Sequence, residues 1–197
     1  MKQEVIDRRR AELVKAGLSI KSIEAMSKHT KSLCGCDKIE VRFDNLYKLG
    51  FDAKALVEAN VTILNRKSDY VVKRFSVIKT WFVSLDKNVD VHLLFMNRIQ
   101  LWSMSSNKLI TLQLLSRHLK GDITPERLCT FFTCSLENIL LMYIEGFNDF
   151  MKLRNEVRYR VEHDRLRMSI ELKRNIIKKR YKKLPKDVFE YYNKHFL

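Results

Sequence analysis

One local pattern recurs along this chain at nearly constant intervals. An apolar residue is followed by a Ser, Asp or Thr that can cap a helix, and an amphipathic helical pattern comes next. The four candidate caps are Ser19, Asp52, Asp90 and Thr124, so that successive caps lie 33, 38 and 34 residues apart. A side-chain oxygen at such a position accepts a hydrogen bond from a backbone N–H of the first helical turn. The recurrence predicts one helical unit that is used four times.

The residues before the caps are suited to ending the preceding helix. Gly17, Gly50 and Asn88 each stand two residues before a cap. Gly and Asn adopt the left-handed backbone conformation that closes many helices. In the fourth unit Asp122 takes this place, and Pro125 then occupies the first helical position, where its missing N–H costs least. Each unit therefore carries both a stop signal and a start signal.

A second helix is expected within each unit. Ser68 and Ser106 open the patterns SDYVVKRFSVIKTWF and SNKLITLQLLSRHL in the second and third units. The first unit offers CDKIEVRFDNLYKL, and the fourth offers ENILLMYIEGFNDFMKL, in which Gly146 allows a bend or break. We predict an all-α protein, an α-solenoid of degenerate helix-turn-helix repeats of about 33–38 residues in which each unit packs on its neighbours. The alternative is that four ordinary amphipathic helices align by chance.

Composition agrees with a folded, helical and basic protein. The chain has five Gly and two Pro in 197 residues, so few turns are enforced and long helices are favoured. Hydrophobic residues make up 46%, enough to bury a core. Lys and Arg outnumber Asp and Glu by 38 to 23, a formal net charge of +15. An excess of this size indicates an acidic polymer partner such as nucleic acid.

The sequence favours an intracellular, reducing compartment. No apolar run reaches 18 residues, and the basic N-terminus lacks the apolar stretch of a secretory signal. Cysteines occur at only four positions and do not make a disulfide framework. Cys34 and Cys36 could be half of a zinc site completed by Cys129 and Cys134, but the last two stand five apart and do not share a helix face. We expect small core cysteines, no metal and no cofactor.

Residues 152–186 differ in character from the rest of the chain. They contain 14 Lys and Arg against four acids, while apolar residues persist at spacings of three or four. We predict a long basic helical segment, 152–197, that continues the domain formed by helical repeats in residues 1–151. A solvated helix face or a disordered tail is the alternative. The apolar periodicity and the shortage of acids to pair with the bases argue against it.

These basic residues are the candidate nucleic-acid-binding site. Phosphates of double-stranded DNA or structured RNA would release counterions on contact with them, so binding should weaken steeply with salt. A smaller basic group near the start of the second unit's second helix would extend the footprint. The predicted contact residues are Arg66, Lys67, Lys73, Arg74, Arg154, Arg158, Arg160, Arg165, Arg167, Lys173, Arg174, Lys178, Lys179, Arg180, Lys182 and Lys183.

Two other functional classes stay open. One is a protein-interaction solenoid, for example a ribonucleoprotein subunit whose basic helix grips RNA or an acidic partner. The other is a basic amphipathic helix at a membrane, which we disfavour because the apolar face is needed by the fold. No Gly-rich phosphate loop, Gly-x-Ser-x-Gly or His-Glu-x-x-His motif occurs, so we predict no enzymatic activity and no catalytic residues.

The stretch LGFDAKALVEANVTILNRKSDYVVKRFSVIKTWF resembles one repeat of the mitochondrial transcription termination factor (mTERF) family. The matching positions are Leu49, Gly50, Phe51, Asp52, Leu56, Ile63, Leu64 and Ser68. The ending DVFEYYNKHFL is similar to the aromatic-rich terminal helix of these proteins. The resemblance implies a curved α-solenoid that binds double-stranded DNA or structured RNA. It also implies a non-enzymatic role in organellar or bacterial-type gene expression, either in transcription or in rRNA and ribosome function. The location that it implies is the mitochondrion; without the resemblance we expect the cytoplasm.

Overall fold

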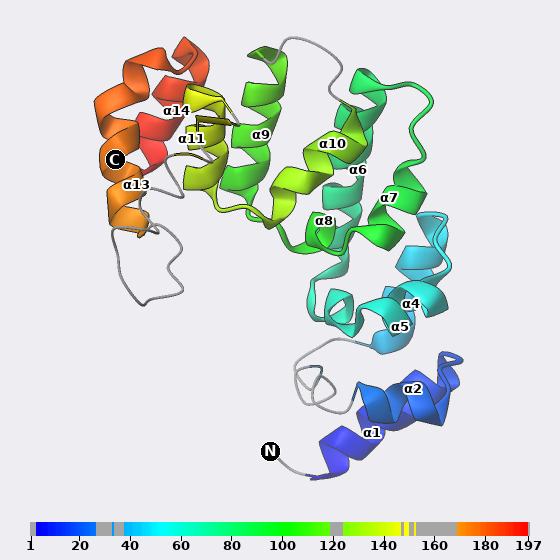
Figure 1. Ribbon diagram of the computed structural model, residues 1–197. Helices are drawn as coiled ribbons and strands as arrows, with labels where there is room; N and C mark the ends of the chain where they lie inside the picture. Colours follow the sequence, from blue (N-terminus) through cyan, green and yellow to red (C-terminus); the bar gives the residue numbers. More distant parts are fainter. Residues whose placement is uncertain are drawn as a thin grey trace. The chain divides into compact units, whose positions relative to one another are not determined.

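The described part of the chain is helical. The computed structural model describes residues 3–26, 33, 38–118, 124–146, 148–149, 152 and 169–196, and no strand occurs among them. The all-α prediction is confirmed for these residues. The helices labelled in Figure 1, together with three 3-10 turns (η), are α1 (Gln3–Lys15), α2 (Ile20–Ala25), α4 (Ile39–Lys48), α5 (Ala53–Ala59), η2 (Val61–Asn65), α6 (Ser68–Leu85), α7 (Val91–Asn97), α8 (Gln100–Ser103), α9 (Ser106–His118), α10 (Pro125–Thr130), η3 (Phe131–Thr133), α11 (Leu136–Glu145), α13 (Ile170–Arg180), η4 (Tyr181–Lys183) and α14 (Lys186–Phe196).

The helices form two compact units. The N-terminal unit is Met1–Ser103, and the C-terminal unit is Met104–Leu197. The boundary predicted from the sequence falls between residues 151 and 152, and residue 151 lies outside the described residues. The helices α13 and α14 share their unit with α9, α10 and α11.

All four predicted helix caps form. In each, the side-chain oxygen accepts a hydrogen bond from a backbone N–H three residues on, which satisfies a donor that the start of a helix leaves unpaired. The bonds join Ser19 to Ser22 at 3.0 Å, Asp52 to Ala55 at 3.0 Å, Asp90 to Leu93 at 2.9 Å, and Thr124 to Arg127 at 3.3 Å. The helices α6 and α9 begin at Ser68 and Ser106, as predicted. These local features are confirmed, whereas the stacking of units into a solenoid stays a prediction.

Two glycines close the helices before the first two caps. Gly17 and Gly50 have φ of +91° and +87°. After Gly50, the Phe51 N–H donates to the Leu46 carbonyl at 3.1 Å, while the Gly50 N–H donates to the Tyr47 carbonyl at 2.9 Å. This pair of bonds is the Schellman closure, in which a left-handed residue satisfies the last carbonyls of a helix. The closure turns the chain so that Phe51 enters the core, where it is 4% exposed.

An aromatic cluster fills the core of the N-terminal unit around Phe51. Its ring centroid lies 5.1 Å from that of Phe75 on α6 and 5.4 Å from that of Trp102 on α8. Phe95 on α7 packs on Trp102 at 4.4 Å, and the Trp102 indole N–H donates to the Phe95 carbonyl. The His92 ring packs against this cluster, and its Nε2 lies 2.9 Å from the Leu49 carbonyl oxygen. Trp102 is 2% exposed and therefore belongs to the core.

In the C-terminal unit, α11 packs against α13 and α9, and α14 packs against α9 (Figure 1). Val188 and Tyr192 on α14 are buried. Two polar contacts join α14 to α9: His118 Nε2 lies 2.7 Å from Asp187 Oδ1, and the Tyr191 hydroxyl lies 3.1 Å from Asn107 Oδ1. The C-terminal segment is thus fixed to the unit by both apolar and polar contacts.

Lys108 joins α9 to the end of η3. Its ammonium donates to the backbone carbonyls of Phe132 and Cys134. These are among the carbonyls that a helix end leaves unpaired. Burial lowers the pKa of Lys108 below its usual range, and the nearby Cys134 opposes that effect.

The helix α11 is shorter than the sequence pattern predicts. The pattern continues from residue 137 to 153, yet α11 ends at Glu145. Gly146 follows with φ of +76°, a backbone conformation that L side chains rarely adopt. The break that Gly146 allows therefore occurs, and it ends the helix.

We predict that Gly50→Ala destabilises the protein more than Gly17→Ala. Both substitutions force a left-handed alanine, which costs about 1 kcal/mol. At Gly50 the added Cβ would also lie 3.1 Å from His92 Nε2, whereas at Gly17 it meets nothing within 4 Å. Urea unfolding followed by circular dichroism measures both free energies. In a His92→Ala background the excess cost at Gly50 should disappear, and its persistence would contradict the steric explanation.

We also predict a loss of stability at alkaline pH that depends on Tyr192. Burial and the charge of Glu137 raise the pKa of this phenol above 10.0, against an opposing effect of Arg174. The unfolded chain then releases the phenol proton at lower pH than the folded chain, so this stabilisation falls as pH rises above 10. The unfolding free energy of Tyr192→Phe should fall less between about pH 9 and about pH 11 than that of the wild type. The half-exposed Tyr47→Phe is the matched control, and an equal effect there would count against this origin.

Candidate nucleic-acid interface

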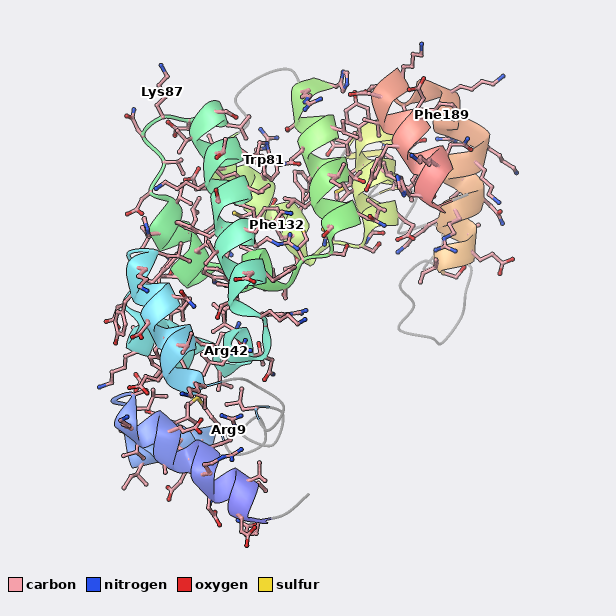
Figure 2. The ribbon with its side chains drawn as sticks, turned by 180° about the vertical axis from the view of Figure 1, so that it is seen from behind. Arg9, Arg42, Trp81, Lys87, Phe132 and Phe189 are labelled. Carbon is pink, nitrogen blue, oxygen red and sulfur yellow. The ribbon has the colours of Figure 1, made fainter. Side chains whose placement is uncertain are left out.

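The helix α13 buries one side and exposes the other. Ile177 is fully buried and Lys173 is 6% exposed, while Lys178 and Lys179 are exposed. The last turn carries Lys178, Lys179 and Arg180, a placement that the helix dipole favours by about 0.3–1 kcal/mol per charge. Figure 2 shows side chains projecting outward from this helix, which is drawn in pale orange. Burial of the apolar residues thus determines which cations reach solvent.

Two arginines of α13 are neutralised by carboxylates of α11. Arg174 Nε lies 3.6 Å from Glu137 Oε1, and Arg180 forms an ion pair with Glu145. Both glutamate side chains are 12% exposed, so the pairs lie partly inside the packed surface. The glutamate near the start of α11 pairs with the earlier arginine of α13, and the glutamate at its end pairs with the later one. The two helices therefore run in the same direction. Glu137 and Glu145 lie outside residues 152–186, so a charge count within that segment misses both partners.

Four lysines remain exposed beyond the two pairs. Lys178, Lys179, Lys182 and Lys183 are all exposed, and we call them the lysine quartet. They occupy the end of α13 and the η4 turn, as two pairs of lysines four residues apart. Within the described residues, no carboxylate forms a salt bridge with any of them. Among the described residues, the quartet is the largest group of predicted contact residues that lies unpaired on one exposed segment.

The quartet has an electrostatic cost. Four exposed like charges within residues 178–183 repel one another, and no carboxylate of the described residues forms a salt bridge that would offset this. The helix dipole offsets part of this for Lys178 and Lys179, but Lys182 and Lys183 lie beyond the end of α13. A polyanion would remove the repulsion and supply the missing counter-charge. This local conflict between charge and stability is typical of a functional surface.

A second basic group lies in the N-terminal unit. Arg66 and Lys67 form the turn before α6, and Lys73 lies on that helix; all three are exposed. The Arg66 guanidinium carbon lies 5.8 Å from the ring centroid of Tyr70. Lys87 is not part of this second basic group, since Figure 2 shows it projecting from the turn at the other end of α6.

The other predicted contact residues differ in accessibility. Arg74 is 5% exposed, and its guanidinium donates to the Tyr70 hydroxyl and lies over the Tyr70 ring. Arg74 and Lys173 are buried, so we leave them out of the proposed surface. Five further residues lie outside the described residues: Arg154, Arg158, Arg160, Arg165 and Arg167.

The described residues show no arrangement for metal chemistry. No group of three or more His, Cys, Asp or Glu side chains among them is placed to hold a metal ion. Cys129 is buried and Cys134 is half-buried, while Cys34 and Cys36 fall outside the described residues. Nor does any described helix combine the length and apolarity needed to cross a membrane.

Comparisons with known proteins give no relative from which to transfer a function. No protein-family model matches the chain, and neither a curated protein nor a solved structure matches it. The resemblance to the mTERF family therefore rests on the residues quoted for it.

Proposed function

We propose that this protein binds nucleic acid, double-stranded DNA or structured RNA, through the phosphate backbone. The observation that carries the proposal is the lysine quartet, four exposed cations on one segment without an ion-pair partner among the described residues. Arg66, Lys67 and Lys73 would add contacts from the N-terminal unit. A net charge of +15 would increase the rate of encounter with a polyanion.

A polymer satisfies the quartet better than a small anion does. The four lysines stand within six consecutive residues, 178–183, at the end of α13 and in η4, so they present a short row of charge on one exposed segment. Duplex DNA carries one negative charge per about 1.7 Å of axis, so several phosphates can face the row at once. One small anion would contact part of the row and leave the remaining repulsion in place.

We further propose that the capped helical units stack as an α-solenoid, as the resemblance to the mTERF family implies. Supporting features are the four caps and the two Schellman closures. A non-enzymatic role in organellar gene expression would follow from that family.

The first test is the salt dependence of binding. Fluorescence anisotropy with labelled duplex DNA, an RNA hairpin and single strands gives dissociation constants between about 50 and about 300 mM salt. We expect the duplex or the hairpin to bind, with log K falling linearly against log salt. Binding that is absent at about 50 mM salt, or flat with salt, would refute the proposal.

The second test removes the quartet and compares the result with a control variant of the same net charge. One variant replaces Lys178, Lys179, Lys182 and Lys183 with Gln, and a matched control replaces four exposed lysines of the N-terminal unit, Lys21, Lys38, Lys48 and Lys54, with Gln. Both variants lose four charges, so only the position differs. The quartet variant should weaken binding to all sequences alike and make the salt slope shallower by about 3 to 4 for duplex DNA.

Equal effects of the quartet variant and the control would show that net charge alone attracts the polymer. An acidic protein partner is the rival occupant. It would be indicated if the quartet variant lost binding to an acidic polypeptide while neither variant nor wild type bound nucleic acid. Either result would replace the nucleic-acid proposal.

A further inference from the structure

The C-terminal unit contains an apolar cavity separate from the quartet. Its volume is about 660 Å³, and it lies between α9, α10 with η3, and α11. This volume is within the range of roughly 300–1,000 Å³ that is typical of small-molecule pockets. The apolar side chains that line it are Leu112, Leu115, Leu128, Phe131, Ile139 and Met142. Such a lining favours an aliphatic or aromatic occupant over water.

Three polar side chains line the same cavity: Arg127 and Thr130, which are exposed, and Tyr143, which is half-buried. The Thr130 hydroxyl donates to the backbone carbonyl of Arg127 at 2.6 Å, so it is already engaged. Within the described residues, neither the Arg127 guanidinium nor the Tyr143 hydroxyl has an ion pair or hydrogen bond; the Arg127 contact with Thr124 uses its backbone N–H. The cavity therefore combines an apolar lining with one guanidinium and one phenol hydroxyl that have no hydrogen-bond or ion-pair partner among the described residues.

The hydroxyl is suited to donating a hydrogen bond to an anion. Burial raises the pKa of Tyr143, and the charge of Asp187 raises it further, so the phenol keeps its proton. Asp187 itself is engaged by His118 at 2.7 Å. Among the described side chains that line the cavity, Arg127 is the one that carries a positive charge.

We propose that this cavity binds a small amphipathic anion, a single aliphatic chain that ends in a carboxylate. The chain would lie among the leucines, Ile139 and Met142, and the carboxylate would accept hydrogen bonds from Arg127 and Tyr143. Arginine and a carboxylate form the strongest type of protein hydrogen bond. The inference is independent of nucleic-acid binding, since no member of the quartet lines the cavity.

Isothermal titration calorimetry of the full chain with dodecanoate, below its micelle concentration, tests the proposal. We expect saturable binding of one ligand per chain. Arg127→Gln should weaken it at least about tenfold, as the loss of a charged hydrogen bond implies. Dodecanol, which has the same chain without the charge, should bind Arg127→Gln as it binds the wild type. Tyr143→Phe should weaken dodecanoate binding less than Arg127→Gln does.

Two controls separate the cavity from general attraction to a basic protein. Arg117→Gln removes an exposed arginine of α9 that does not line the cavity, and the quartet variant removes four lysines elsewhere in the same unit. Both should keep the wild-type affinity for dodecanoate. Arg127→Gln should also keep the wild-type affinity for nucleic acid, so that failure of one proposal does not imply failure of the other. Circular dichroism and thermal unfolding verify that each variant folds.

Three outcomes would overturn the proposal. The first is the absence of saturable dodecanoate binding, and the second is an equal loss in the quartet variant, which would indicate surface adsorption. In the third, dodecanoate fails to bind while an acidic amphipathic peptide binds in an Arg127-dependent way. The cavity would then be a docking groove for a partner helix.

Discussion

The short helices of this protein depend on contacts outside themselves. The helices α5 and α7 have seven residues each and α10 has six, whereas an isolated helix in water needs roughly 12–15 to be even marginally stable. Caps at their starts satisfy the orphan N–H groups, and burial of one side against neighbouring helices supplies the remaining stabilisation. Loss of the tertiary contacts would therefore unfold these short helices as well.

This dependence explains why the sequence predicts the helix starts so well. A cap is a local event: Asp52 or Asp90 needs only the next three residues, so the prediction requires no knowledge of distant contacts. Gly17 and Gly50 are equally local, since their left-handed conformation follows from the missing Cβ. The end of α11 is harder to predict, because the apolar period continues past Gly146 and only the backbone shows that the break occurs.

The candidate site is predictable in composition but not in accessibility. Counting charges correctly identifies the end of α13 as basic. It cannot show that Arg174 and Arg180 are paired, since Glu137 and Glu145 lie more than 30 residues earlier in the chain and reach them only through packing. Nor does it show that Arg74 is buried against Tyr70. Long-range packing therefore reduces the predicted contact residues to the cations that can meet a ligand.

The cavity had no sequence signal either, because Leu112, Leu128 and Ile139 look like any core positions.

The contact between His92 and Leu49 has a consequence for the chemistry of the imidazole ring. A carbonyl oxygen can only accept a hydrogen bond, so Nε2 must carry the proton, and in the neutral ring Nδ1 then holds the lone pair. A backbone group 43 residues away in the sequence thus selects one tautomer. The tautomeric state of His92 is therefore a spectroscopic reporter on the packing of α7 against the end of α4. If that packing opened, the proton would be free to exchange between the two nitrogens.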